Sequence, residues 1–399
     1  MSGRAVSVAR VLTTLAVGNY RSLRDLVLPL SRLTVVTGAN GSGKSSLYRA
    51  LRLLADAARD GAVAALAREG GLPSALWAGP ETVGRAVREG RAPVQGTRRT
   101  KPVGLRLGFA GDEFGYALDL GMPVPDLRTA FNRDPEFKRE CVWSGPVLRP
   151  AALLADRAGP VVRTRERKGA WDREPHRIGL TDSMLTAFAD PRVSPDVLVV
   201  RERIRSWRFY DHFRTDADAP ARQPRVGTRT PVLDHEGADL AAALQTICEV
   251  GDPDALHTAV DQAFPGSRVD VAAGEDGRFG LRFRQHGLLR PLSAAELSDG
   301  TLRYLLWVAA LLSPRPPELL VLNEPETSLH PDLLPALAAL VATAAERTQV
   351  VVVTHARPLV RALESVGDAA LLELRKEHGA TVLAGQGMLD RPAWHWPKR

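Results

Sequence analysis

The feature that most constrains this chain of 399 residues is a glycine-rich segment near its start. Residues 38–45 read G-A-N-G-S-G-K-S and fit the pattern G-x-x-x-x-G-K-[ST]. They follow an apolar run, Leu33–Thr37, that predicts a buried strand. They precede a predicted helix from Lys44 towards Ala58, with leucines at helical spacing. Strand, glycine-rich turn and helix in this order predict an α/β fold with a phosphate-binding loop.

The chemistry of this loop predicts a nucleotide and a metal ion. Glycines let successive backbone N–H groups point at phosphate oxygens, and the helix adds the positive end of its dipole. Lys44 brings a positive charge to the β- and γ-phosphates, and the hydroxyl of Ser45 is a hard oxygen ligand for Mg²⁺. We therefore predict ATP and Mg²⁺ as cofactors. The predicted nucleotide-binding residues are Gly38, Ala39, Asn40, Gly41, Ser42, Gly43, Lys44, Ser45 and Ser46.

Polar residues follow two later apolar runs. Leu319–Leu322 precedes Asn323 and Glu324, and Val350–Val353 precedes Thr354 and a histidine at position 355. In phosphate-loop ATPases an acidic residue at such a strand end holds Mg²⁺, and a polar or acidic residue orients the attacking water. We predict Asn323 as a metal ligand and Glu324 as a catalytic residue. His355 is the second predicted catalytic residue; a lone strand-end histidine is more often structural, but the order of loop, glutamate and histidine favours contact with the γ-phosphate.

A third segment opens a predicted helix. Residues 297–301 read L-S-D-G-T, and a serine hydroxyl with a glycine at a helix N-terminus forms a second anion-binding site. Taken alone, the same five residues are typical of a helix N-cap.

The composition and the hydrophobic pattern change along the chain and suggest three segments. Residues 1–123 contain the glycine-rich loop, predicted strands at 10–17 and 25–30, and a predicted hairpin over 103–120. Residues 124–232 are punctuated by proline, glycine and arginine, carry no heptad pattern and predict an inserted α+β lobe. Residues 233–399 alternate helical and strand patterns, which predicts a mostly parallel sheet. Helices are expected at 237–249, 254–264 and from 300, 331 and 358, and strands at 268–273, 279–284, 319–322 and 349–353.

The charge is positive and unevenly distributed. The chain has 53 basic and 46 acidic residues, a net charge of +7. Residues 141–230 alone hold 17 basic and 11 acidic residues, an excess that attracts a polyanion such as DNA or else solvates a surface. Within this stretch Arg205–Arg214 interleaves arginines with aromatic residues. Such a pattern can stack single-stranded nucleic acid, although a helix with its aromatic side in the core is the favoured interpretation.

Several classes of protein are excluded by what the chain contains. Cys141 and Cys248 are its two cysteines, too few for a disulfide framework. No apolar run approaches the roughly 20 residues of a membrane span. The apolar stretch near the N-terminus lacks a small-residue cleavage pattern. We therefore expect a cytoplasmic protein with no membrane partner. Trp394 and Trp396 are expected to pack on the chain's own fold.

Together these segments resemble the ABC-type ATPase head, within the RecF/SMC/OLD-like group rather than the transporters. Residues 19–23, N-Y-R-S-L, are similar to the opening N-F-R-S-L of that group, and residues 297–301 are similar to its signature L-S-G-G-Q. Residues 323–331, N-E-P-E-T-S-L-H-P, resemble D-E-P-E-x-x-L-H-P, which combines Walker B and D-loop. The resemblance implies a P-loop NTPase head with a mostly parallel sheet, an antiparallel β portion and an inserted α+β lobe.

The resemblance also implies a mechanism. Two heads form a homodimer around two ATP molecules, each bound by Lys44 and Ser45 of one chain. Ser298, Asp299 and Gly300 of the other chain close each site. Glu324 activates water and His355 senses the γ-phosphate. Binding of ATP then drives dimerisation, and hydrolysis releases the two heads.

This sequence departs from the family pattern at the metal site. Asn323 replaces the usual aspartate, and its neutral amide oxygen is a weaker ligand for Mg²⁺. Gln95, before the predicted strand at 103–109, is the candidate for the metal-binding glutamine of the Q-loop. With no long coiled coil and no acidic Toprim module after Gln386, we expect a stand-alone head rather than an OLD nuclease.

Three functions fit these observations. The first is an ATPase that acts on DNA in repair or recombination, as RecF-like factors do. The second is the ATPase of an anti-phage defence or toxin-control system that regulates a partner effector protein. The third is an ATP-gated clamp that hydrolyses little because of Asn323. A fold-level resemblance does not choose between them.

Overall fold

The computed structural model describes residues 10–81, 91, 103–165, 169–387 and 389–399. It folds into two compact units. Unit 1 contains the described residues up to Ser31, residues 38–207 and residues 372–399, and unit 2 contains residues 32–37 and 208–371. These units cut across the three consecutive segments expected from the sequence, since the middle segment, 124–232, is divided at Trp207.

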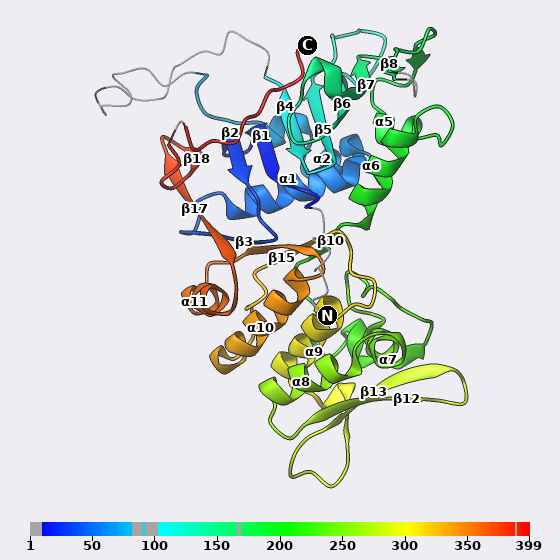
Figure 1. The fold of residues 1–399 in the computed structure, drawn as a ribbon, viewed down its shortest axis with the longest axis vertical. Coiled ribbons are helices and arrows are strands. Elements are labelled where there is room, and N and C mark those ends of the chain that lie inside the picture. The colour runs from blue at the N-terminus through cyan, green and yellow to red at the C-terminus, as the bar shows by residue number, and fades with distance from the viewer. Residues whose placement is uncertain (1–9, 82–90, 92–102, 166–168, 388) are drawn as a thin grey trace, which may run out of the picture. The chain divides into compact units, whose positions relative to one another are not determined.

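Unit 1 contains an antiparallel sheet of eight strands in the order β2-β1-β4-β5-β6-β7-β8-β9 (Figure 1). The expected antiparallel β portion is therefore confirmed, and the predicted hairpin at 103–120 is β4 with β5. Strand β6 pairs directly with β5, so the residues expected in a separate lobe continue this sheet. The strands are β1 (Thr14–Tyr20), β2 (Leu23–Pro29), β4 (Leu105–Ala110), β5 (Phe114–Gly121), β6 (Glu136–Ser144), β7 (Leu153–Ala158), β8 (Val161–Thr164) and β9 (His176–Arg177).

Helices cover this sheet. Helix α1 (Lys44–Ala57) packs against β1, β4 and α2, and its leucines at helical spacing are buried. Helix α6 (Pro195–Ser206) packs against β6, β7 and α1. The remaining helical elements of unit 1 are α2 (Ala62–Arg68), α3 (Leu72–Ala75), the 3₁₀ turn η1 (Pro150–Ala152) and α5 (Met184–Ala187).

The end of the chain adds a hairpin that the sequence analysis missed. Strand β17 (Ala369–Glu377) pairs antiparallel with β18 (Ala380–Leu383), and β18 lies beside β2. The tail that follows packs on unit 1, as expected, because the ring centroids of Trp394 and Trp143 are 5.7 Å apart. Those of Trp394 and Trp396 are 5.2 Å apart.

Unit 2 contains a parallel sheet in which β10, β15, β16 and β3 lie side by side. This confirms the predicted parallel sheet. The apolar residues of β15 and β16 are almost fully buried, as in a sheet covered on both faces. Since the four strands are parallel, their carboxyl ends meet at one edge. Their bounds are β10 (Arg208–Tyr210), β15 (Leu319–Asn323), β16 (Gln349–Val353) and β3 (Leu33–Gly38).

The helices of unit 2 match the predicted ones to within a few residues. Helices α7, α8 and α10 pack against α9, whose residues from Leu302 to Leu311 are all buried, and α11 packs on α10. Helices α7 and α8 also lie against a small antiparallel sheet (Figure 1). The helices are α7 (Leu240–Val250), α8 (Pro253–Ala263), α9 (Asp299–Leu311), α10 (Leu334–Ala345) and α11 (Arg357–Val366). The small sheet and 3₁₀ turns are β11 (Arg225–Val226), β12 (Arg268–Ala273), β13 (Arg278–Arg284), β14 (Leu292–Ser293), η2 (Pro220–Arg222), η3 (Ala294–Glu296) and η4 (Pro331–Leu333).

The aromatic residues of the arginine-rich stretch lie in the core. Trp207 is buried in unit 1, and Phe209, Tyr210 and Phe213 are buried in unit 2. The core interpretation is therefore confirmed, although the segment forms the short strand β10 and a loop rather than a helix. Base stacking on these rings is excluded because they are not exposed. No described helix is long and apolar enough to cross a membrane.

Candidate functional site

The glycine-rich loop leaves β3 at Gly38 and enters α1 at Lys44. Gly38, Gly41 and Gly43 have φ angles of 146°, 76° and 113°, a region that only glycine occupies at low cost. Gly43 is the N-cap of α1, and no side chain caps the helix. The first-turn N–H groups of α1 are therefore left for an anion, as the sequence predicts for a phosphate.

Polar side chains of the loop are held close to its backbone. The Nζ atom of Lys44 donates to the carbonyl oxygens of Gly38 at 2.7 Å and Ala39 at 3.2 Å. The hydroxyl of Ser42 is buried without a hydrogen-bond partner among the described residues, whereas Ser45 is exposed. A buried hydroxyl that lacks a partner is costly unless a ligand satisfies it. These features fit a bound phosphate chain.

The hairpin β17–β18 forms a wall around this loop, which the sequence analysis did not foresee. The hydroxyl of Thr381 donates to the carbonyl oxygen of Ser42 at 2.7 Å. A Cβ atom at Gly43 would lie 2.2 Å from Thr381 Oγ1, and one at Gly38 would lie 2.3 Å from the carbonyl oxygen of Leu374. Two of the loop glycines are therefore required by packing as well as by their φ angles.

In unit 2 the two predicted catalytic residues meet at the edge of the parallel sheet. Glu324 follows β15 with a positive φ of 48°, and its N–H donates to the carbonyl oxygen of Val353 at 2.7 Å. His355 Nδ1 lies 3.0 Å from Glu324 Oε1. Because a carboxylate only accepts hydrogen bonds, Nδ1 is the donor and carries a proton. Both side chains are partly exposed, which leaves them accessible to a ligand.

A buried carboxylate supports this pair. Glu326 accepts a hydrogen bond from the hydroxyl of Thr354 at 2.5 Å, and its Oε1 lies 3.6 Å from His355 Nδ1. The hydroxyl of Thr354 in turn accepts the N–H of Ala356 at 3.0 Å. Glu326 was part of the quoted motif, but the sequence analysis gave it no role; the geometry makes it a positioning residue for the turn that carries His355.

Asn323 is paired with a residue that the sequence analysis did not select. Its Nδ2 atom donates to Oδ1 of Asp211 at 3.1 Å. Asp211 directly follows β10, whose Tyr210 is paired in register with Leu322 of β15. The predicted metal ligand Gln95 lies outside the described residues. The strand that follows it, β4, lies between β1 and β5 in the antiparallel sheet of unit 1.

The signature-like segment caps helix α9. Ser298 is the N-cap, and its Oγ accepts the N–H of Thr301 at 3.2 Å. Asp299 Oδ1 accepts a hydrogen bond from Arg222 Nη2 at 2.7 Å. A Cβ atom at Gly300 would meet only the carbonyl oxygen of Ser328, at an ordinary 3.5 Å. The fold therefore explains Ser298 as a cap, but it does not explain why position 300 is a glycine.

A buried arginine of α9 holds the loop that follows β15. Arg303 is 4% exposed, and its Nη1 donates to the carbonyl oxygen of Thr327 at 2.8 Å. Its Nη2 donates to the carbonyl oxygen of Phe213 at 2.9 Å and to Oγ1 of Thr215 at 3.0 Å. Burial lowers the pKa of the Arg303 guanidinium below its ordinary value. Arg303 therefore connects α9, the D-loop-like segment and the residues after β10.

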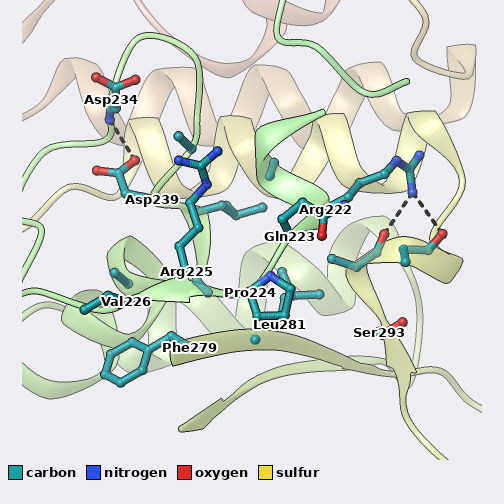
Figure 2. A pocket seen from close by; sticks show the side chains of 18 residues that line it. Arg222, Gln223, Pro224, Arg225, Val226, Asp234, Asp239, Phe279, Leu281 and Ser293 are labelled. Atoms are coloured by element: carbon teal, nitrogen blue, oxygen red, sulfur yellow. Dashed lines mark hydrogen bonds between the residues drawn. The ribbon is translucent and has the colours of Figure 1, made fainter. Parts of the chain in front are cut away.

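A pocket of about 490 Å³ lies elsewhere in unit 2 and contains none of the predicted catalytic or nucleotide-binding residues. Figure 2 shows its apolar side, with Pro224, Leu281 and Phe279, and its charged side, with Arg225 and Asp239. Arg222, which borders it, also donates to the carbonyl oxygens of residues 294 and 297 at 2.8 Å each. The pocket is thus next to the segment that leads into the signature, and we assign it no ligand.

The metal-ligating residues of the described chain are few. No group of three or more His, Cys, Asp or Glu residues that could hold a metal ion occurs in the part of the chain that the structure describes. Mg²⁺ in nucleotide sites commonly uses one or two protein oxygens together with phosphates and water. The exposed hydroxyl of Ser45 in unit 1 is one oxygen of this kind.

A glycine-rich loop before a helix and parallel strands ending in polar residues define the P-loop NTPase class. A family model described as "AAA domain, putative AbiEii toxin, Type IV TA system" matches residues 33–362. The chain therefore belongs to this family, AAA_21. No curated protein matches the chain.

The chain is also similar to solved structures, at low sequence identity. A structure titled "Crystal structure of the SmcHead bound to the C-winged helix domain of ScpA" has a TM-score of 0.50 and 12% identity, and covers 95% of this chain and 98% of that one. The SMC head domain from Thermotoga maritima has a TM-score of 0.46 and 14% identity, with coverages of 94% and 99%. The fold is that of an SMC-type ATPase head.

Proposed function

We propose that this chain binds ATP with Mg²⁺ and hydrolyses it. The observation that carries the proposal is the 3.0 Å hydrogen bond between His355 and Glu324. The two residues meet at the carboxyl edge of the parallel sheet, where ATPases of this kind place the residues that act on the attacking water. The uncapped N-terminus of α1 and the folded-back amine of Lys44 support binding of the phosphates. The family and the fold support the same chemistry.

The residues have distinct roles in the proposed reaction. Lys44 leaves the carbonyl oxygens of its own loop to neutralise phosphate charge. Glu324 orients a water molecule and accepts its proton as the water oxygen attacks the γ-phosphorus and ADP departs. His355, whose Nδ1–H is held by Glu324, presents its other ring nitrogen to the γ-phosphate. Ser45 and Asn323 are the predicted residues that would hold Mg²⁺, and the bound ion would supply positive charge to offset the charge that develops on the phosphate oxygens.

We further propose that two copies of the chain close around ATP, with Ser298, Asp299 and Gly300 acting on the nucleotide of the partner. The unexplained glycine at position 300 supports this, since a Cβ atom added there would have only the carbonyl oxygen of Ser328 within 4 Å among the described residues. In such a dimer a Lys44→Ala chain and a Gly300→Glu chain are each inactive. Mixing them restores one of the two sites in each mixed dimer, and about half of the dimers in an equal mixture are mixed, so roughly a quarter of the activity should return.

A matched control and a contrary result make this test decisive. Gly300→Ala keeps the helix start and adds a methyl group in ordinary contact, so it controls for folding. If the mixture of the two inactive chains stays inactive while Lys44→Ala chains still associate, action in trans is wrong.

The partner of the ATPase is proposed to be DNA, in the manner of RecF-like repair factors. The support is the excess of basic over acidic residues in 141–230. The aromatic residues of 205–214 are buried and add no support. The test is ATP hydrolysis with and without single- and double-stranded DNA at two salt concentrations, with Glu324→Gln as control. Stimulation that weakens with salt and vanishes in the variant supports the proposal. Hydrolysis indifferent to DNA, without salt-sensitive binding, contradicts it.

The family description favours a second function. Its words "putative AbiEii toxin, Type IV TA system" fit an ATPase that regulates a partner effector in a defence or toxin-control system. The test is to co-express the chain with the product of an adjacent nuclease or toxin gene. ATP-dependent association, lost in Lys44→Ala, supports this function. In the clamp alternative the same association persists while hydrolysis is too slow to measure.

A further inference from the structure

Asn323 stands where the family pattern has an aspartate, so it lacks that residue's negative charge. The neighbouring strand, β10, is followed by an aspartate. β10 and β15 are parallel, and Tyr210 is in register with Leu322. The next residue on each strand is therefore level at the carboxyl edge of the sheet. These residues are Asp211 and Asn323, and Nδ2 of the asparagine donates to Oδ1 of the aspartate at 3.1 Å.

We propose that Asp211 is the carboxylate of the Mg²⁺ site, moved by one strand from the position at which the family pattern has it. This inference rests on the proposed function. It treats Asn323 as a positioning residue whose amide orients Asp211, with an amide oxygen left as a further hard ligand. The pair then carries one negative charge, as a single aspartate at 323 would.

The charge of residue 211 determines which residue is favourable at position 323. Two carboxylates about 3 Å apart cannot both remain ionised without a cation, so an aspartate at 323 beside Asp211 is unfavourable. An asparagine at 323 instead donates to the carboxylate and stabilises its charged form. The departure of Asn323 from the family pattern is therefore explained by Asp211, rather than by loss of the metal site.

The surroundings fit a carboxylate that serves a ligand. Asp211 and Asn323 are both half-buried, so each keeps an exposed side at the sheet edge. Glu324, the predicted catalytic residue, follows Asn323 directly, and His355 lies against it. On the other side, His212 accepts a hydrogen bond from the buried guanidinium of Arg303 at 3.2 Å, which fixes the chain just after Asp211.

The test exchanges the two side chains without changing their shape. Asp211→Asn removes the charge but keeps a carbonyl oxygen to accept from Asn323. Asn323→Asp places two carboxylates together, and the double variant D211N/N323D reverses the pair. Each protein is titrated with Mg²⁺ in the presence of a fluorescent ATP analogue, and Mn²⁺ binding is followed by electron paramagnetic resonance.

We expect Asp211→Asn to raise the Mg²⁺ concentration at half-saturation about tenfold or more. Asn323→Asp alone should not weaken metal binding, because the cation offsets the repulsion between the two carboxylates, and it should not raise turnover, contrary to the clamp alternative. The double variant should return to within about threefold of the wild type. Affinity for the nucleotide in EDTA and the melting temperature serve as controls for folding.

The outcomes separate this inference from the function on which it rests. If the wild type does not bind ATP with Mg²⁺, the proposed function fails. If the wild type binds ATP but Asp211→Asn titrates with Mg²⁺ as the wild type does, only the inference is overturned. A double variant as weak as Asp211→Asn overturns it too. If Asp211→Asn is unstable, the comparison of Asn323→Asp with the double variant decides the question.

Discussion

Two groups of predicted site residues are held in place by different means. The loop group, residues 38–46, is held by backbone shape: three glycines with positive φ, an uncapped helix start and a wall formed by Thr381 and Leu374. The strand-end group, residues 323–327 and 354–355, is held by side chains that bind one another. The first group has no room for a Cβ atom at Gly38 or Gly43, whereas the second depends on which chemical groups are paired.

This difference determines which substitutions each group can accept. In a backbone cradle the glycines are fixed by positive φ angles and, at Gly38 and Gly43, by close packing, so they cannot be exchanged in compensating pairs. A network of side chains permits exchanges that keep the total charge and the hydrogen bonds, as the pair of Asn323 and Asp211 illustrates. The predictions that follow disturb the two groups separately.

The largest effect is expected from adding one methyl group to the loop. In Gly43→Ala the new Cβ would lie 2.2 Å from Thr381 Oγ1 and 2.9 Å from its Cγ2, and φ is 113°. The loop must distort, so ATP binding should fall by at least about a hundredfold, a change of roughly 3 kcal/mol. The measurement is titration with a fluorescent ATP analogue.

Gly41→Ala is the matched control for this prediction. Position 41 has a φ of 76° but nothing within 4 Å of a Cβ atom. It therefore tests backbone strain without the collision. Such strain costs about 1–2 kcal/mol in a left-handed residue. Equal losses of binding in the two variants would show that strain alone, and not the wall formed by Thr381, constrains the loop.

A second large effect is expected where the strand-end group meets α9. Arg303→Met removes the hydrogen bonds to the carbonyl oxygens of Thr327 and Phe213 and leaves them buried. Since hydrogen bonds to charged groups contribute about 1.5–3 kcal/mol, the free energy of unfolding should fall by about 3 kcal/mol. The measurement is denaturation with urea.

Arg361→Met on the exposed face of α11 is the control for the arginine substitution. An exposed arginine should change the free energy of unfolding by no more than about 0.5 kcal/mol. A similar loss in both variants would contradict the role of Arg303 as the link between α9 and the D-loop-like segment.

A smaller effect separates the structural role of Ser298 from its proposed role in trans. Ser298→Ala removes the cap on the N–H of Thr301 and should cost about 1 kcal/mol of stability. Ser298→Asp keeps a cap and should restore stability, but its charge would oppose a partner's phosphates. Recovery of both stability and hydrolysis in Ser298→Asp would contradict action in trans.

The loop group was predictable because it is contiguous. Residues 38–45 carry their pattern, flanking strand and helix within one stretch of sequence, and α1 begins at Lys44 as expected. Glu324 and His355 were predictable because each stands within two residues of the end of an apolar strand. Asp211 was not, because β10 has three residues and no pattern, and its partner is 112 positions away. Thr381 lies on a hairpin whose contact with the loop arises only in the folded chain.

The smallest effect concerns the histidine beside Asp211. His212 Nε2 accepts from Arg303 Nη2 at 3.2 Å, so this nitrogen is unprotonated. Burial, and then the charge of Arg303, lower the pKa of His212 below its ordinary value of 6.5. As pH falls through about 6.5, the unfolded chain takes up a proton that the folded chain rejects, so stability should decrease.

Measured between pH 7.5 and about 5, His212→Gln should show a shallower loss of stability than the wild type. His257→Gln, an exposed histidine on α8, should show the slope of the wild type. A wild-type slope in His212→Gln would mean that the contact with Arg303 does not favour the neutral ring. The side-chain contact would then not contribute to stability at neutral pH.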